Sequence, residues 1–325
     1  METFYLFLVV FLGILAIFDL SVGVSNDAVN FLNASIGSKA ASFRVIMIVA
    51  ATGILVGASL SNGMMDIARH GIYQPQYFYF SEIMCILVAV MLTDVVVLDV
   101  FNSLGMPTST TVSLVFELLG GTVAYSLVKI INDSQGLLEL GHLMNTDKAL
   151  TVILGIFLSV AIAFFFGMVV QYISRLIFTF NYKKTAKYFI GVFGGIAATS
   201  IIYFMLIKGL KSSPIFSGSF ADYVLSHTGT VVLYCFVGFT ILMQVLHWLH
   251  VNVFKVIVLM GTFALALAFA GNDLVNFIGV PLAGYSAYSD FMAQHGTVAP
   301  DTFLMTSLQS SAKTPWYFLL GAGIV

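Results

Sequence analysis

The chain has 325 residues, of which 59% are hydrophobic and 9% are charged, and its formal net charge at pH 7 is -2. A soluble domain carries about 25% charged residues, so 13 basic and 15 acidic side chains are too few to cover a water-facing surface. Nucleic acid is excluded as a partner, because phosphate binding needs clustered Lys and Arg and the chain has no basic block. The solvent of this chain is therefore expected to be mostly lipid.

Apolar runs succeed one another along the sequence at lengths that suit membrane-spanning helices, which need about 20 residues each. The runs show no period-2 alternation, which argues against a transmembrane β-barrel. The sequence predicts an all-α polytopic membrane protein with eight full spans and a ninth that is cut off at Val325. The expected spans are 3–24, 45–64, 81–104, 109–131, 149–176, 188–208, 229–250 and 254–271, and the ninth opens near Pro315.

A six-residue motif occurs twice, once after the first span and once after the eighth. Residues 26–31 are Asn-Asp-Ala-Val-Asn-Phe, and residues 272–277 are Asn-Asp-Leu-Val-Asn-Phe. Small or helix-breaking residues follow each copy, and counting spans sends the first and eighth in opposite directions. The pattern predicts inverted-topology repeats with interrupted helices, which mark the substrate site of secondary transporters. The expected divisions are a first repeat with the transport core at 1–131, connecting and scaffold helices at 132–253, and the start of a second repeat at 254–325.

Each copy of the motif places a carboxylate at membrane depth, where an Asp costs roughly 2.5–3.5 kcal/mol and needs a compensating partner. The spacing supplies side-chain oxygens at i, i+1 and i+4, and oxygens are the ligands that hard cations prefer. The alternative is that these side chains only hydrogen-bond neighbouring helices, but two near-identical copies favour an ion site. A sodium ion is the expected occupant, and no transition metal is expected. The candidate cation-binding residues are Asn26, Asp27, Asn30, Asn272, Asp273 and Asn276.

A second element, Gly-Met-Pro-Thr-Ser-Thr-Thr at 105–111, precedes the apolar run of the fourth span. A helix that starts there offers unpaired N–H groups and the positive end of its dipole to an anion. Hydroxyl groups at Ser109, Thr110 and Thr111 add donors that suit phosphate or sulfate, so these three residues are candidate substrate ligands. Hydroxyl residues also cap helix N-termini in general, and capping alone stays open as the alternative.

Four further acids lie inside or at the ends of the expected spans. Asp19 and Glu117 are expected to lie deep, and Glu117 follows the hydroxyl element by two turns, where it could titrate or balance charge. Asp94 and Asp99 lie near the end of the third span, so an interfacial position and a role in a cation pathway both remain open. Asp19, Asp94 and Glu117 are kept as secondary candidates.

These motifs resemble the signature of the inorganic phosphate transporter (PiT) family of sodium- or proton-coupled phosphate permeases. The segment Gly-Val-Ser-Asn-Asp-Ala-Val-Asn-Phe at 23–31 is similar to that family's G-A-N-D-V-A-N motif, and 270–283 looks like its second copy. Pro-Thr-Ser-Thr-Thr at 107–111 is similar to the family's P-x-S-T-T-H element. The resemblance implies cation-coupled symport of inorganic phosphate by alternating access. It also implies that the two Asn-Asp motifs lie near the ion sites and that the hydroxyl element contacts phosphate.

The chain departs from the family pattern in three places. Val112 stands where the family often has His, which puts proton coupling through that position in doubt, and Glu117 stands where small residues are usual. A second hydroxyl element, at the spacing of the first, would fall beyond Val325. The length therefore predicts that these 325 residues lack part of the second repeat.

Other functions are alternatives to sodium-coupled phosphate symport. A proton-coupled phosphate permease or a sulfate permease of the same fold is the close alternative. A passive channel would need a more polar lining, and an intramembrane aspartyl enzyme using Asp27 and Asp273 as a dyad is disfavoured by the flanking Asn residues. The chain is therefore expected to be no enzyme and to need no cofactor beyond the coupling ion. It is expected in the cytoplasmic (inner) membrane if bacterial, with apolar faces that meet lipid or, in a homo-oligomer, a second copy.

Overall fold

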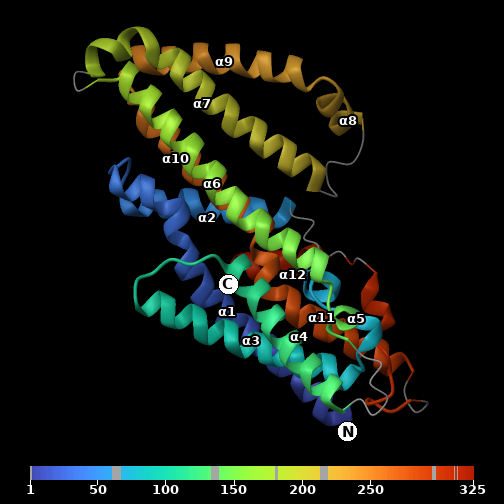
Figure 1. Cartoon of the computed structure of the whole chain (residues 1–325). Coiled ribbons are helices and arrows are strands. Elements are labelled where there is room, and N and C mark those ends of the chain that lie inside the picture. The colour runs from blue at the N-terminus through green and yellow to red at the C-terminus, as the bar shows by residue number, and fades with distance from the viewer. Residues whose placement is uncertain are drawn as a thin grey trace. The chain divides into compact units, whose positions relative to one another are not determined.

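The computed structural model of the chain describes residues 2–60, 67–132, 139–179, 182–212, 219–294, 298–310, 312 and 314–325. These residues are mostly helical and contain no β-strand, which confirms the expected all-α fold (Figure 1). The helices are α1 (Glu2–Gly37), α2 (Phe43–Leu60), η1 (Ile67–Gly71), η2 (Pro75–Tyr77), α3 (Phe80–Ser103), α4 (Thr110–Asn132), α5 (Leu140–Leu143), α6 (Thr146–Ile177), α7 (Tyr182–Ser212), α8 (Ser219–Ser226), α9 (Thr228–Trp248), α10 (Val253–Asn272), α11 (Leu274–Ala293), η3 (Thr306–Gln309) and α12 (Trp316–Ile324).

Eight helical stretches among the described residues are long and apolar enough to cross a membrane. They agree with the eight spans expected from the sequence, and they make the chain an integral, multi-pass membrane protein. The eighth stretch, Val253–Ala293, is longer than expected because α11 continues the apolar run of α10. The sequence did not predict α11 as a helix of its own, since its Gly and Pro residues pointed to an irregular segment.

The chain divides into two compact units, each assembled from segments that are far apart in the sequence. Unit 1 contains residues 1–29, 62–156 and 272–325, and unit 2 contains residues 30–61 and 157–271. Both copies of the Asn-Asp motif and the hydroxyl element contribute to unit 1, which therefore holds the candidate site.

In unit 1, α1 and α11 lie against each other and run antiparallel. The ring of Tyr5 lies 6.4 Å from that of Phe291, and Leu12 lies where a Cβ on Gly284 would fall. Further along α1, a Cβ on Gly23 would overlap the ring of Phe277. Rising numbers on α1 thus meet falling numbers on α11, so the two motif-bearing helices point in opposite directions, as inverted repeats require.

The expected helix interruption is present at the second motif and absent from the first. Helix α10 ends at Asn272 and α11 begins at Leu274, with Asp273 as the junction between them. In contrast, α1 continues as one helix of 36 residues through its Asn-Asp motif to Gly37. The expectation of an interrupted first helix is therefore wrong, because the small residues that follow this motif end the helix at Gly37 and do not break it at membrane depth.

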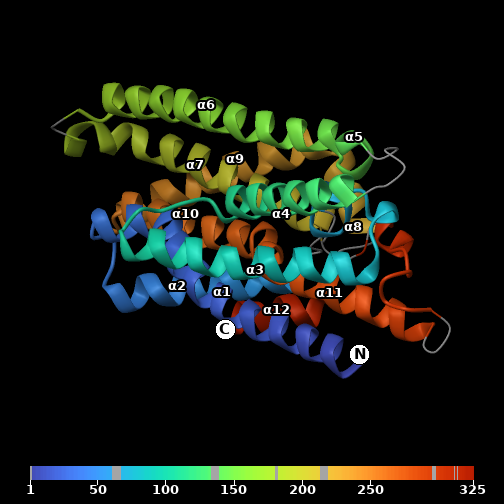
Figure 2. The same cartoon turned by 60° about the horizontal axis from the view of Figure 1, so that its bottom comes forward.

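The core of unit 1 is apolar and aromatic, and α3 is its central helix. Helix α3 packs against both α4 and α11 (Figures 1 and 2). At one end of this core the rings of Phe80 and Phe291 stack with centroids 4.6 Å apart. This packing brings α1, α3, α4 and α11 together around the polar residues described below.

A buried arginine fastens η1 to the later segments of unit 1. Arg69 is 4% exposed; its Nη1 donates to the hydroxyl of Ser286, and its Nε and Nη2 donate to the carbonyls of Ser310 and Ser307. Nearby, the buried hydroxyl of Tyr73 donates to the carbonyl of Ala68, and burial raises the pKa of Tyr73 while Arg69 opposes that shift. The segment around Arg69 is therefore joined to residues 286–310 by hydrogen bonds as well as by packing.

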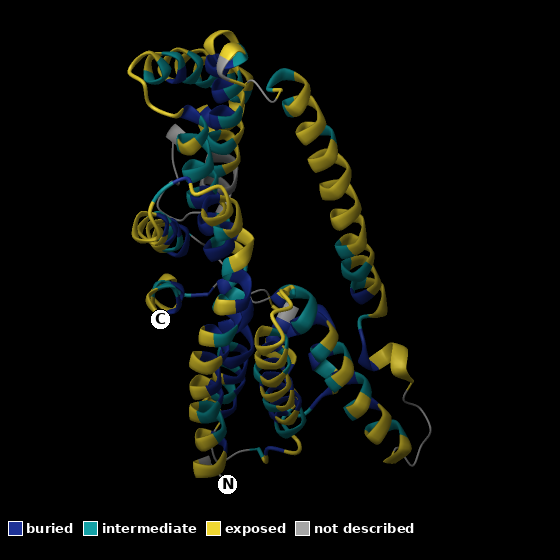
Figure 3. Ribbon diagram, turned by 90° about the vertical axis from the view of Figure 1, so that its left-hand side faces the viewer, coloured by how far each residue is buried: buried dark blue, intermediate teal, exposed yellow. Residues whose placement is uncertain are grey.

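Unit 2 is held together by small residues that let helices approach closely. Gly53 and Gly57 form a Gly-x-x-x-Gly pair on α2, and a Cβ on either would collide with the backbone of α10. On α7, Gly194 and Gly195 lie against Met243 and Thr240 of α9 in the same way. Outside such contacts many helix residues are exposed (Figure 3). The exposed residues include many large apolar ones, most of all along α6, as suits a lipid solvent.

Candidate functional site

The hydroxyl element begins in a tight turn that joins α3 to α4. Gly105 has φ of +67°, a left-handed conformation that favours glycine, and the Met106 N–H donates to the carbonyl of Phe101. Pro107 follows, and α4 begins at Thr110. The N–H of Val112 donates a hydrogen bond to the Ser109 hydroxyl. Ser109 thus caps α4, as the alternative interpretation of this residue expected, and its side chain is exposed.

Asn26 binds this turn with both ends of its amide. Its Oδ1 accepts from the Thr108 N–H at 2.8 Å, and its Nδ2 donates to the Met106 carbonyl at 3.2 Å. Asn26 is only 4% exposed, and both hydrogen bonds are partly buried. The first motif therefore positions the start of α4, which aligns the hydroxyl element with the interior of unit 1.

Each of the next two threonines contacts the carboxylate of a different motif copy. Thr110 donates to Oδ2 of Asp27 at 3.2 Å, and Thr111 donates to Oδ1 of Asp273 at 3.4 Å. The Thr111 hydroxyl also accepts from Nδ2 of Asn276 at 2.9 Å. Asp27 and Asp273 interact electrostatically as well, so two like charges and two hydroxyls meet at one place.

The structure thus brings together most of the predicted site residues. Asn26, Asp27, Thr110 and Asn276 are buried, and Thr111 and Asp273 are half-buried. Two predicted residues lie at the margin of the site, Ser109 at the cap and Asn272 with an exposed side chain. Asn30, which is also exposed, belongs to unit 2. Two carboxylates that face hydroxyl and amide groups can accept a cation and, once neutralised, an oxyanion on the same hydroxyls.

A second polar group of unit 1, which we call the acid cluster, consists of Asp19, Asp94, Ser113 and Glu117. The Ser113 hydroxyl lies 2.9 Å from Oδ1 of Asp94 and 2.7 Å from Oε1 of Glu117. Asp94 is 2% exposed, whereas Asp99 on the same helix is exposed. No sequence motif singles out Ser113, although its place four residues before Glu117 puts both on one helix face.

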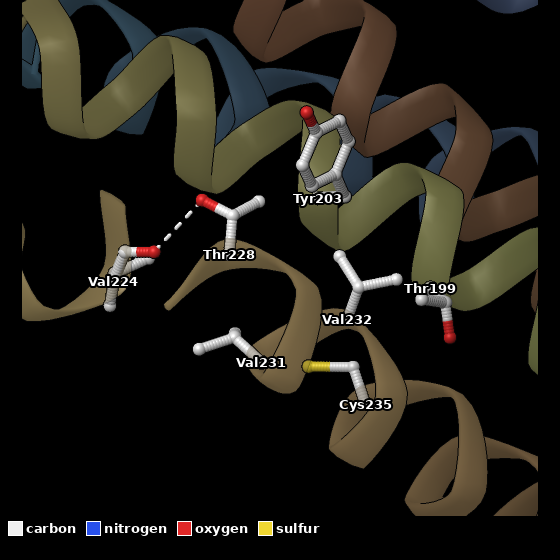
Figure 4. A pocket seen from close by; sticks show the side chains of 7 residues that line it. All are labelled: Thr199, Tyr203, Val224, Thr228, Val231, Val232 and Cys235. Carbon is white, nitrogen blue, oxygen red and sulfur yellow. Dashed lines mark hydrogen bonds between the residues drawn. The ribbon is translucent and has the colours of Figure 1, made fainter. Parts of the chain in front are cut away.

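Each unit contains a cavity lined by described residues. In unit 1 a hollow of about 430 Å³ lies between α3 and α4 and reaches Ser113 and Glu117. In unit 2 a small pocket is lined by side chains of α7, α8 and α9, among them Thr199, Tyr203 and Cys235, and the Thr228 hydroxyl there donates to the Val224 carbonyl (Figure 4). The pocket of unit 2 has no charged lining residue, so it does not suit an inorganic ion.

Among the residues that the structure describes, no three His, Cys, Asp or Glu side chains are grouped closely enough to hold a metal ion. Any cation at the Asn-Asp motifs would therefore need amide, hydroxyl and backbone oxygens beside the two carboxylates. A ligand set in which most oxygens come from uncharged groups suits a monovalent hard cation.

A polar site buried among apolar, antiparallel helices defines this chain as a polytopic membrane protein of the transporter type. The model of the phosphate transporter family matches residues 23–325. The chain belongs to the phosphate transporter family.

Two individual proteins are similar to this chain. A sodium-dependent phosphate transporter of Plasmodium falciparum is 36% identical over 129 residues, which are 39% of this chain and 19% of that protein. The chain thus spans less than two thirds of the length of this curated relative. A solved structure described as the sodium-dependent phosphate transporter superimposes with a TM-score of 0.65 and 20% identity, covering 98% of this chain and 74% of that one. The similarity to this solved structure supports the all-α fold of the chain.

Proposed function

We propose that the protein carries inorganic phosphate across a membrane together with sodium, by alternating access. The observation that carries this proposal is the convergence of Asp27, Asp273, Thr110 and Thr111 within unit 1. Membership of the phosphate transporter family and the sodium-dependent relative support the choice of phosphate and of sodium. As a transport site, this arrangement calls for no catalytic residue.

Charge balance explains why anion and cation would move together. Phosphate that enters beside two carboxylates is repelled unless cations bind there too. Sodium held by Asp27 and Asp273 would neutralise the site and free the Thr110 and Thr111 hydroxyls to donate to phosphate oxygens. The antiparallel pair α1 and α11 would then present the site to one side of the membrane and to the other in turn.

Asn26 acts in this proposal as a positioning residue as well as a candidate ligand. Both ends of its amide hold the turn before α4, so the hydroxyls reach the carboxylates only while Asn26 stays bound. Asn276 has the same relation to Thr111. Another predicted cation ligand, Asn272, would coordinate the ion from the edge of the site.

The experiment is phosphate uptake by the full-length protein in proteoliposomes under an inward sodium gradient, an inward proton gradient, or neither. We expect sodium-driven uptake that disappears in Asp27→Asn and persists in Asp99→Asn, an identical change at an exposed position of α3. Uptake driven only by protons would show that the coupling ion is the proton and not sodium. Sulfate uptake in place of phosphate uptake would contradict the proposed substrate.

A further inference from the structure

The acid cluster places three carboxyl groups inside the transport unit without a basic partner. Asp19 lies on α1, Asp94 on α3, and Ser113 and Glu117 on α4. Asp19 interacts electrostatically with both Asp94 and Glu117, which are of like charge. Among the described residues, no Lys or Arg forms an ion pair with any of the three, and Lys129, further along α4, pairs with Glu82. Three ionised carboxylates in this arrangement would repel one another in an apolar interior.

The geometry at Ser113 shows how the cluster can reduce that charge. A serine hydroxyl has one proton and can donate to one acceptor at a time. Its oxygen nevertheless lies within hydrogen-bonding distance of both Asp94 and Glu117, at 2.9 and 2.7 Å. Both contacts are hydrogen bonds only if one of the two carboxyl groups carries a proton and donates it to the Ser113 oxygen. The arrangement therefore accommodates one proton beyond that of the Ser113 hydroxyl, carried by either Asp94 or Glu117.

Asp19 gives an independent indication of the same kind. Its side chain is 0% exposed, neither carboxyl oxygen accepts a hydrogen bond from a donor group, and its side-chain contact is with another carboxyl group, that of Asp94. Oε2 of Glu117 is likewise buried and without a partner. A buried carboxylate with neither donors nor a counter-ion is the costliest form of the group, and a proton removes its charge.

The arrangement of the cluster suits a proton better than a metal ion. Among the described residues, no group of three His, Cys, Asp or Glu side chains could hold a metal ion. Protons need no cage, because a hydroxyl can relay them between two carboxyl groups. The hollow between α3 and α4 reaches Ser113 and Glu117, so Glu117 is the carboxyl group through which a proton can enter.

We propose that the acid cluster is a proton-binding site beside the proposed sodium site, in which Ser113 shares an exchangeable proton between Asp94 and Glu117 and Asp19 holds the innermost one. Asp94 interacts electrostatically with Asp27, and Asp273 faces Asp27 from the second motif. A cation at Asp27 therefore favours ionisation of the cluster. Conversely, a proton in the cluster reduces the repulsion on the Asp27 carboxylate, which is then more stable without a cation. Sodium and protons bind antagonistically, and by linkage each lowers the affinity for the other by the same factor. Only this antagonism rests on the proposed function; the proton site itself does not.

The test is infrared difference spectroscopy of the full-length protein in lipid, which detects the C=O stretch of protonated carboxyl groups without any transport. We expect a protonated-carboxyl band at neutral pH that weakens in Asp19→Asn and in Glu117→Gln. Asp99→Asn, the matched change at an exposed acid of α3, should leave the band unchanged. A wild-type protein with no such band between about pH 5 and about pH 9, or a band that persists in both cluster variants, would overturn the proposal. Ser113→Ala replaces either variant that does not fold.

The linkage is tested by adding sodium to the same samples. We expect sodium to reduce the band and release protons into a weakly buffered medium, and the half-saturating sodium concentration to rise about tenfold at low pH in the wild type but not in Asp19→Asn. A band that responds to pH but not to sodium would overturn the antagonism. Failure of phosphate uptake with the band and its sodium response intact would refute the proposed function and leave the proton site standing.

Discussion

The Thr111 hydroxyl on α4 donates to Oδ1 of Asp273, which lies 162 residues further along the chain at the junction of α10 and α11. The same oxygen accepts from Asn276, so one side chain of the first repeat contacts two residues of the second motif. The start of α4 is held from the other side by Asn26. Both motif copies thus reach one helix N-terminus, and changes there test the site most sharply.

Replacing Thr111 with Val, which keeps the shape and removes the hydroxyl, should lower sodium-driven phosphate uptake strongly. The amide of Asn276 and a carboxylate oxygen of Asp273 would lose a partner, at a cost of about 1–3 kcal/mol, which corresponds to about fivefold to about 150-fold in apparent affinity. Thr111→Ser keeps the hydroxyl and should retain most uptake. Equal loss of uptake in both variants would mean that the methyl group, and not the hydroxyl, matters.

Removing the Asn26 side chain should uncouple the 105–108 turn from α1. Asn26→Ala loses the bonds to Thr108 and Met106, so the hydroxyls of α4 are no longer held towards the carboxylates. We expect the KM for phosphate to rise by about tenfold or more, as two hydrogen bonds at about 1 kcal/mol each imply. Asn132→Ala, an exposed change at the other end of α4, should leave KM unchanged. An unchanged KM in Asn26→Ala would remove this residue from the site.

A methyl group at position 23 should damage the packing of the two repeats. A Cβ on Gly23 would overlap the Phe277 ring, whereas a Cβ on Gly13, ten residues earlier on α1, meets nothing within 4 Å. Thermal unfolding in detergent should show a lower Tm for Gly23→Ala, at a cost of about 1–3 kcal/mol, and no loss for Gly13→Ala. Phe277→Leu should restore part of the Tm to the Gly23→Ala variant. A Tm that is the same for both alanine variants would contradict the close approach of α1 and α11.

Arg69 should be intolerant even of lysine. A lysine has one nitrogen and cannot replace the separate Nε, Nη1 and Nη2 donors that bind Ser310, Ser286 and Ser307. We expect Arg69→Lys to lower stability by about 1–3 kcal/mol, measured by thermal unfolding. Arg44→Lys, a change of the same kind at an exposed position of α2, should leave the Tm in place. A wild-type Tm in Arg69→Lys would show that these bonds contribute little.

Much of the site could be predicted from the sequence because its determinants are local and repeated. The Asn-Asp motif is duplicated, and the hydroxyl element follows a Gly-x-Pro turn, so residue type and spacing alone single out Asp27, Asp273, Thr110 and Thr111. The eight spans follow from composition, since each crossing needs a long apolar run. The place of these residues as ion or phosphate ligands is a prediction that the uptake and binding measurements test.

The features that the sequence did not reveal depend on contacts between distant segments. Helix α1 runs through the first motif to Gly37, so the small residues after Asn30 mark the end of the helix and not an interruption within it. The role of Ser113 depends on α3 bringing Asp94 beside it, and the burial of Asp94 depends on the same contact. No periodicity in α4 alone carries that information.

Phosphate binding to the purified full-length protein, measured over a series of sodium concentrations at constant ionic strength, tests the central claim most directly. The two carboxylates at Asp27 and Asp273 should repel phosphate until cations occupy the site. The account predicts that phosphate affinity rises with sodium concentration and that the rise is lost in Asp27→Asn. Phosphate affinity that is the same in sodium, in every other cation tested and in the variant would contradict it.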